Sequence, residues 1–224
     1  MRKVIITAIT LLALPTVGMA ANFGSIFGAL TTANTVGKGN ATFGGSLGLA
    51  DATSFIGSVN YGVGNNTDAR FHLGVFDNTG FDSEIAFGAD MKFKLNKNKK
   101  AKGGSNIDFA IGPIFEYVKM DINDPLLTSS TKVTQFGVQL LVSSTSNSKS
   151  GSSWTPYGRF NIRNESISTE IDLGVLGTVS ASSSELAIGV NGGLAYATSP
   201  AFTLYGEFQL GGNDGFFFGA NFKL

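Results

Sequence analysis

The sequence contains no cysteine, only one histidine and one tryptophan, and few charged residues, which make up 14% of its 224 positions. The lack of cysteine excludes disulfide bonds and a lipoprotein anchor, so stability must come from other sources. Calcium-loop, zinc-ligand, P-loop and dinucleotide-binding spacings are also missing, so no metal or cofactor is expected. Basic and acidic residues number 16 each, which is no signature of nucleic-acid binding.

Long apolar runs are missing too, since none after residue 20 reaches the length of a transmembrane helix. The chain is nevertheless apolar overall, with a mean hydropathy of +0.15, 30 glycines and 19 phenylalanines. Its apolar residues alternate with polar ones. In the clearest segment Ile85, Phe87, Ala89, Met91, Phe93 and Leu95 alternate with Glu84, Ala86, Gly88, Asp90, Lys92 and Lys94. A period of two places these sets on opposite faces of a strand, one suited to lipid and one to a polar interior.

Repetition of this pattern predicts a closed antiparallel transmembrane β-barrel over residues 38–224. Ten strands are expected, at 40–50, 54–64, 69–77, 84–95, 106–119 and 132–143, from 153, up to 198, at 201–210 and at 215–224. Eight or twelve strands are the alternatives. Residues 120–131 are expected to form a loop, and 164–184 an extension of two strands into a hairpin above the membrane. Pro113, within a strand, predicts a bulge because it cannot donate a ladder hydrogen bond.

The first 20 residues have the pattern of a secretory signal peptide. Met1–Lys3 is basic, 4–14 is mostly apolar, and Gly18–Ala20 offers small residues for cleavage after Ala20. Removal of Arg2 and Lys3 leaves 14 of the 16 basic residues against 16 acidic ones.

Residues 21–37 form an N-terminal segment that does not alternate. Phe23, Ile26, Phe27 and Leu30 have the spacing of an amphipathic helix. Two arrangements remain open, a short helix tucked into the barrel and a mobile periplasmic tail. Many inward positions are glycine, which either barrel curvature or an inserted segment would require.

Charged residues recur on the predicted interior face and aromatic residues at one end of the exterior. The interior charges are Asp90, Lys92, Lys94, Asp108, Glu116, Arg159, Arg163, Glu185 and Glu207. They either pair across strands and fill a narrow barrel, or line a water-filled pore. The outward aromatic residues Tyr61, Trp154, Tyr196 and Phe222 are expected to form an interfacial girdle at the periplasmic end.

Catalysis is not expected. The single histidine, His72, is predicted to face the interior far from the outer surface, and the sequence has no Gly-x-Ser-x-Gly elbow. The sequence therefore predicts no catalytic residues.

The last strand, Gly215–Leu224, resembles the C-terminal strand of bacterial outer-membrane barrels, although Leu224 replaces the usual final aromatic residue and Phe222 lies two positions earlier. With the signal peptide and the alternating strands, it makes the whole mature chain resemble the small outer-membrane β-barrels that include outer membrane proteins A, X and W. The resemblance implies a Gram-negative outer membrane, with both termini in the periplasm and the last strand read by the barrel-assembly machinery.

The function that follows is a non-enzymatic, porin-like narrow channel for small solutes or ions, or a structural protein embedded in outer-membrane lipids. The alternative is a surface adhesion or interaction protein that uses 120–131 and 164–184. The sequence does not identify a surface partner.

Overall fold

The computed structural model describes residues 23–77, 84–95, 107–124, 127–148, 151–174 and 177–224. The predicted signal peptide lies outside these residues. The strands are β1 (Ala41–Leu49), β2 (Thr53–Gly64), β3 (Thr67–Asp77), β4 (Glu84–Lys94), β5 (Ile107–Asp124), β6 (Leu127–Ser144), β7 (Ser146–Asn147), β8 (Ser153–Asp172), β9 (Thr178–Ser199), β10 (Phe202–Leu210) and β11 (Gly215–Lys223). Among the described residues, no helix is long and apolar enough to cross a membrane.

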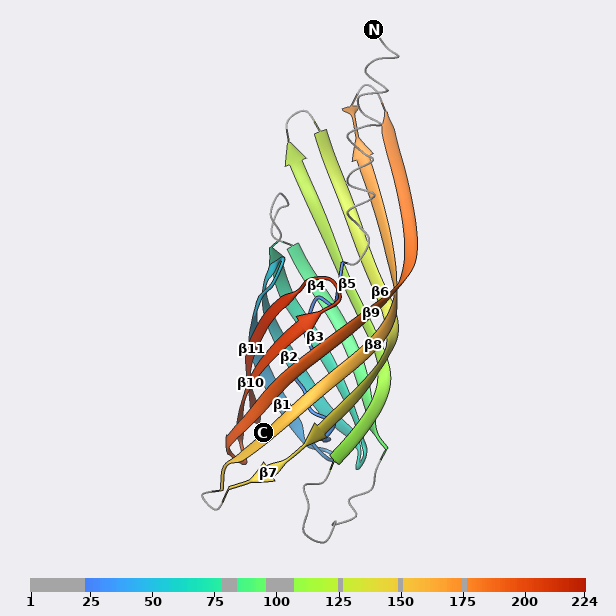
Figure 1. Ribbon diagram of the computed structural model, residues 1–224. Helices are drawn as coiled ribbons and strands as arrows, with labels where there is room; N and C mark the ends of the chain where they lie inside the picture. Colours follow the sequence, from blue (N-terminus) through green and yellow to red (C-terminus); the bar gives the residue numbers. More distant parts are fainter. Residues whose placement is uncertain (1–22, 78–83, 96–106, 125–126, 149–150, 175–176) are drawn as a thin grey trace.

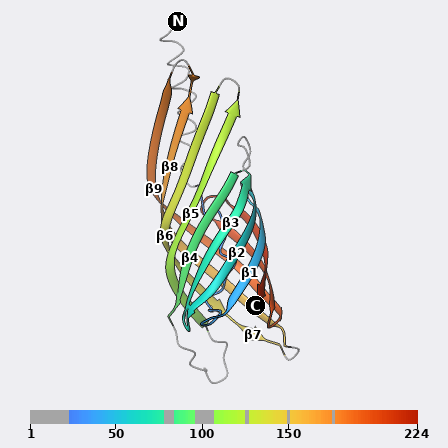
Figure 2. The same ribbon diagram turned by 180° about the vertical axis from the view of Figure 1, so that it is seen from behind.

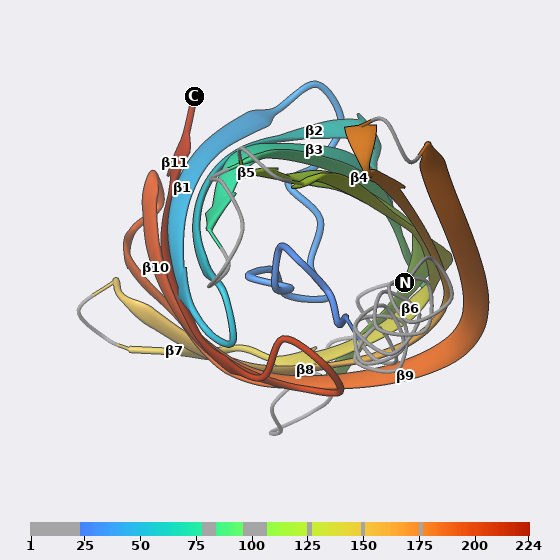
Figure 3. The same ribbon diagram turned by 90° about the horizontal axis from the view of Figure 1, so that it is seen from above.

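All the long strands form one closed antiparallel barrel (Figures 1 and 3). The order runs from β6 through β5, β4, β3, β2, β1, β11, β10 and β9 to β8, and β6 pairs with β8 to close the ring. The first and last strands of the barrel lie side by side, with Phe43 opposite Phe222. The two-residue β7 pairs only with the start of β8. The expected ten-stranded barrel is therefore confirmed.

The outer surface of the barrel is apolar because each strand alternates. Phe55, Phe71, Ile85 and Phe136 are all more than 60% exposed on that surface, which in water would be an unusually apolar belt. The opposite faces of the same strands carry buried polar side chains such as Arg163 and Gln135. Since closure leaves no unpaired edge around the belt, the barrel meets the requirement for a strand protein in lipid.

Four strands rise beyond the others at one end of the barrel, which we call the mouth; the opposite end is the base (Figures 1 and 2). β5, β6, β8 and β9 have 18 to 22 residues, whereas β1, β10 and β11 have 9. Their upper halves stay paired up to Asp124 opposite Leu127, Thr128 opposite Asp172 and Asp172 opposite Thr178. We call this four-stranded extension, residues 119–132 and 166–186, the projecting sheet.

The prediction of a hairpin over 164–184 is confirmed, but the expected loop at 120–131 is wrong. Strand pairing in the β5–β6 hairpin continues to Asp124 and resumes at Leu127. The apolar outer face that marks the strands of the barrel stops near Lys119, because the outer face of the projecting sheet is polar, as at Lys132 and Ser168. The alternating sequence pattern therefore ends at the mouth, while the hydrogen-bonded ladder continues beyond it.

The expected bulge at Pro113 is also wrong. β5 stays in register with β6 on both sides of Pro113, which lies opposite Val138. Toward β4 the pairs at the Pro113 level are missing, but the register is the same above and below. The irregularities occur elsewhere, between Gly62 and Gly64 and between Phe202 and Thr203.

The aromatic residues predicted as a girdle all lie on the outer surface at the base. Trp154 is stacked on Tyr196 with ring centroids 4.1 Å apart, and Phe222 packs against Phe202 at 4.6 Å. Tyr61 lies opposite Ala41, at the start of β1. Their half-exposed rings are positioned to meet a membrane interface.

Candidate functional site

The interior of the barrel is occupied by residues 23–36, which we call the inner segment (Figure 3). Phe23 packs against Phe76 at the mouth, with ring centroids 5.6 Å apart, while Val36 binds Asp68 at the base. The chain then turns into β1, and Gly39 donates to the Gly62 carbonyl at 2.8 Å. The inner segment thus passes through the barrel along its axis from mouth to base.

The inner segment is not helical, so the expected amphipathic helix is wrong. No regular element is present in 23–40, and Gly24, Gly28 and Leu30 have positive φ angles. A regular helix would satisfy its own backbone groups, whereas this segment must find partners for them in the barrel wall.

Four carboxylates supply acceptors for the backbone N–H groups of the inner segment. Glu165 accepts from Phe23 and Gly24 at 2.9 and 3.2 Å, and Glu116 accepts from Ile26 and from the Ser25 hydroxyl, both at 2.6 Å. Glu207 accepts from Ala29 and Leu30 at 2.6 and 2.7 Å, and Asp68 accepts from Val36 at 3.0 Å. Hydrogen bonds to ionised acceptors are about twice as strong as neutral ones, so these four sites hold the segment along its length.

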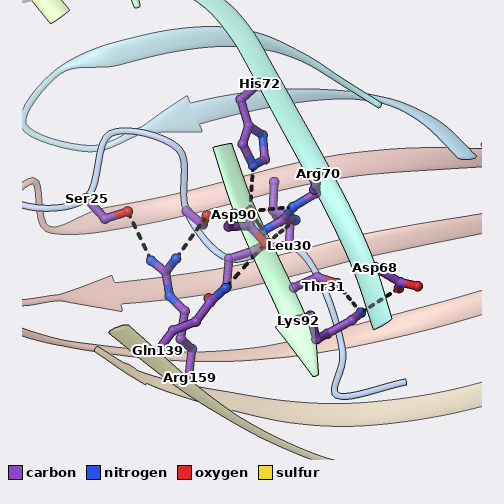
Figure 4. Close-up of polar contacts among 12 residues, drawn as sticks. Ser25, Leu30, Thr31, Asp68, Arg70, His72, Asp90, Lys92, Gln139 and Arg159 are labelled. Carbon is purple, nitrogen blue, oxygen red and sulfur yellow. Dashed lines mark hydrogen bonds and ion pairs between the residues drawn. The ribbon is translucent and has the colours of Figure 1, made fainter. Parts of the chain in front are cut away.

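Cationic and amide side chains bind the carbonyl groups of the same segment (Figure 4). Arg70 donates to the Ala29 carbonyl at 2.5 Å, and Lys92 donates to the Thr32 and Asn34 carbonyls, the former at 3.0 Å. Near the mouth, further donors come from Arg159 to the Gly28 carbonyl, Gln135 to the Gly24 carbonyl and Gln209 to the Ser25 carbonyl. The wall therefore complements both the donors and the acceptors of an irregular backbone.

The charges of the wall also pair with one another. Arg70 and His72 both contact the Asp90 carboxylate, at 2.8 and 3.0 Å, and Lys92 lies 3.4 Å from Asp68. Two further pairs are Lys94 with Asp108 at 2.9 Å and Arg163 with Glu165 at 2.7 Å. Pairing of this kind is needed because an isolated buried charge would be very costly.

All nine charges predicted for the interior lie on the inner face of the wall. Eight take part in the contacts above or in the Arg159–Asn191 hydrogen bond, and Glu185 lies opposite Glu165 at the mouth. Sequence reasoning missed Asp68 and Glu165 as interior residues, because Asp68 lies between the expected strands 54–64 and 69–77, and Glu165 within the hairpin expected above the membrane. Glu165 could have been found, since it is in phase with Arg159 and Arg163 along β8.

His72 serves the packing of this interior. Its ring is stacked on Phe27 with centroids 5.1 Å apart, and its Nε2 contacts Asp90. A cavity of about 10 Å³ beside it, lined by Ser58, Tyr205 and Asn221 among others, has room for about one water molecule. The described residues contain no cluster of metal-ligating side chains.

The interior glycines serve both purposes considered from the sequence, which are room for an inserted segment and curvature of the barrel wall. A Cβ on Gly88 would lie 2.7 Å from the Phe27 ring, and one on Gly219 would lie 3.3 Å from Leu30, so these positions leave room for the inner segment. At Gly74, Gly112 and Gly137 a Cβ would instead meet a neighbouring strand's carbonyl oxygen at 2.5 Å or less. Those glycines allow close approach of strands in a tightly curved wall.

Comparison with known proteins gives similarity in architecture only. No protein-family model and no curated sequence matches the chain. Among solved structures it is similar to the N-terminal β-barrel domain of Pseudomonas aeruginosa OprF, with a TM-score of 0.40 and 10% identity over 84% of this chain and 99% of that one. It is also similar to the Vibrio cholerae outer membrane protein OmpT lacking loop L8, with a TM-score of 0.22 and 8% identity over 83% and 98%. In vitro folded OmpT gives a TM-score of 0.21, with 8% identity over 83% and 96%.

Proposed function

We propose that this chain is a non-enzymatic protein of the Gram-negative outer membrane that is closed to solutes at rest and presents the projecting sheet to the outside. The observation that carries this proposal is the reversal of polarity along the long strands. Within the barrel, β6 turns Phe136 and Leu140 outward and Gln135 inward, whereas in the projecting sheet β8 turns Ser168 and Glu170 outward and Ile171 inward. A polar outer face suits water, so the membrane ends near the mouth and the sheet stands beyond it.

The orientation of the protein follows from the same feature. Outer-membrane barrels have short periplasmic turns and long extracellular extensions. Here β2 joins β3 and β9 joins β10 by tight turns at the base, which we assign to the periplasm together with Leu224. Strand β11, which closes the barrel against β1, is then the element that the assembly machinery would read.

The first described residue lies on the other side. Phe23 is at the mouth, so the described chain does not place its two ends together at the base. Residues 1–22 lie outside the described part, and the periplasmic position of the mature N-terminus stays a prediction. Because the inner segment begins at the mouth, its route supports an extracellular position for residue 23.

A surface-interaction role is tested by deleting part of the projecting sheet. Removal of 168–182 shortens the projecting sheet and takes away none of the side chains described above as binding the inner segment. We expect this variant to lose binding of immobilised host-surface proteins or of phage particles, measured on cells that produce it. Unchanged binding of every probe recognised by the full chain would contradict the role.

A second candidate function is a conditional channel, favoured by the way the inner segment is held. It pairs with no strand in 23–36 and is bound by side-chain hydrogen bonds, so its departure would expose an interior lined by charges of both signs. In planar bilayers we expect the full chain to conduct poorly and a variant lacking 23–36 to conduct ions. Equal conductance of the two would exclude the inner segment as the barrier. The variant lacking 23–36 should retain the binding that the 168–182 deletion loses.

A further inference from the structure

The upper half of β9 has one free edge. β9 pairs with β8 from Thr178 to Ala197, but it pairs with β10 only from Val190 onward, because β10 ends at Leu210. Among the described strands none pairs with 178–187 on the side away from β8. Residues 177–184 are all exposed, and the side chain of Val179 is 50% exposed.

The backbone groups that face this edge can be assigned by parity. Leu173 donates to the Gly177 carbonyl at 3.0 Å, which makes this a hydrogen-bonded pair of the β8–β9 ladder. Hydrogen-bonded pairs alternate along an antiparallel ladder, so the odd-numbered residues of β9 bond β8 in this region. Even-numbered residues from Thr178 to Leu186 therefore direct their N–H and C=O groups toward the free edge.

This edge has few of the features that usually prevent strand addition, and its one inward charge, Glu185, lies near the barrel end. Natural edge strands are blocked by proline, lysine, inward charges or bulges. Residues 178–186, Thr-Val-Ser-Ala-Ser-Ser-Ser-Glu-Leu, contain no proline and no lysine, and Glu185 is their one charged residue. Over the same span the register with β8 is continuous, without a bulge. An extended edge of about 30 Å thus remains open to another strand.

The edge is complementary to itself. An antiparallel twofold axis at Ser182 would place Ser180 opposite Ser184 of a second copy, and Thr178 opposite Leu186. Glu185 would lie opposite the neutral Val179, so no like charges meet. The axis is perpendicular to the sheet, and the two apolar inner faces, which include Ile167 and Ile171, would lie on the same side.

We propose that two copies of this chain join through the 178–186 edges of β9 to form one continuous eight-stranded sheet. The proposal rests on the extracellular role of the projecting sheet proposed above and names its partner. β9 runs from the tip of the sheet to the barrel, so in an antiparallel pair the tip of each copy lies beside the mouth of the other. The two barrels are then at opposite ends of the joined sheet, and the contact links two apposed membranes.

The first test uses phospholipid vesicles that contain the full mature chain. We expect these vesicles to cluster with one another in dynamic light scattering, and not with protein-free vesicles. Ser182→Pro removes an N–H at the free edge and no bond to β8, and we expect it to slow clustering by about tenfold or more, since each paired backbone group left unsatisfied is costly. Ser182→Thr keeps the N–H and suits a strand, so it is the matched control and should cluster as the wild type does.

The second test probes the register and does not depend on tolerance of proline. Vesicles with Ser180→Lys and Ser184→Lys should not cluster among themselves, because the two lysines face each other across the axis. Vesicles with Ser180→Glu and Ser184→Glu should behave in the same way. A mixture of the two populations should cluster, since each lysine then meets a glutamate. Far-UV circular dichroism checks that all variants are folded.

Several results would overturn the pairing. These are dispersed wild-type vesicles, equal clustering with protein-free vesicles, or no recovery in the mixed lysine and glutamate populations. If such a result occurs while deletion of 168–182 still abolishes binding of host proteins or phage, the pairing fails and the surface-interaction role stands. If the deletion also changes no binding, both fail.

Discussion

In the lower half of β8, Phe160 faces outward and Arg159 inward, whereas in the upper half Ser168 faces outward and Ile167 inward. The strand, its neighbours and the alternation of its side chains are the same in both halves. In the placement proposed above only the surroundings differ, because lipid would cover the lower outer face and water the upper one. The direction of the apolar face along a continuous strand therefore locates the membrane boundary.

The two halves also differ in how their inner faces are covered. In the upper part of the barrel, Val118, Val133 and Ile167 form an apolar cluster with Ile26 and Phe27 of the inner segment. Polar side chains of the wall lie beside this cluster, as Glu165 and Gln135 do at Gly24, and also below it, and the backbone of the same segment provides their hydrogen-bond partners in place of water. One short stretch of chain therefore satisfies both the apolar and the polar parts of the lining.

The largest effect should come from Arg163→Ala in the polar interior. Arg163 is 1% exposed and binds Glu165 at 2.7 Å and the Gly211 carbonyl at 2.8 Å. Loss of the guanidinium leaves a buried carboxylate without its cation, and we expect unfolding to become easier by about 3–5 kcal/mol. Urea unfolding in detergent micelles, followed by the fluorescence of Trp154, measures it. A double variant with Glu165→Ala should lose less than the sum of the two single variants.

The next largest effect should separate the two halves directly. Leu140→Arg places a charge on the lipid-facing side, where about 2–4 kcal/mol of stability should be lost in bilayers. Ser168→Arg makes the same side chain on the outer face of the projecting sheet, where we expect a change within about 0.5 kcal/mol. Similar losses for both arginines would show that the membrane boundary does not lie between these positions.

A smaller effect is expected at the centre of the inner segment. Glu207 accepts hydrogen bonds from Ala29, Leu30, Tyr157 and Asn191. Glu207→Gln keeps the shape but removes the charge and one acceptor, which should cost about 1.5–3 kcal/mol. Amide hydrogen exchange at Ala29 and Leu30 should become faster, while exchange in the projecting sheet stays the same. Unaltered protection at both amides would mean that the carboxylate does not hold the segment.

The smallest effect should distinguish two glycines. In Gly88→Ala the new methyl group meets the Phe27 ring, which must shift, at a cost of about 1–3 kcal/mol. Gly45→Ala meets nothing within 4 Å and is expected to be neutral or slightly stabilising. Thermal unfolding of the two variants provides the comparison, and an equal midpoint for both would argue against a tight fit of the inner segment.

Much of the fold could be predicted from the sequence because period-two alternation reports both the strand and its lipid-facing side. The segment from Ile85 to Leu95 is an example, and the predicted strand 84–95 matches β4 closely. The prediction of strands from alternation failed beyond the mouth, where the outer face is no longer apolar. Residues 120–131 have no regular apolar face. The alternation used to predict the other strands therefore did not reveal that these residues pair as strands.

The interior could be predicted only in part. Alternation placed Glu116 and Glu207 on the inner face, but it could not show that they bind backbone N–H groups of 23–36. The spacing of Phe23, Ile26, Phe27 and Leu30 suggested a helix, because a helix would place these four apolar side chains on one buried face. In the structure the segment is also buried because the wall binds its backbone groups, and these partners are distant in sequence, as with the 178 residues between Ala29 and Glu207.

The route of the inner segment has a practical consequence for anything attached ahead of it. Phe23 reaches the mouth beside the projecting sheet, while Leu224 lies at the base. In the orientation proposed above, a peptide tag joined directly before residue 23 would be displayed on the outer side of the membrane, and one joined after residue 224 on the inner side. A single barrel would carry two labels in two compartments, with the membrane between them.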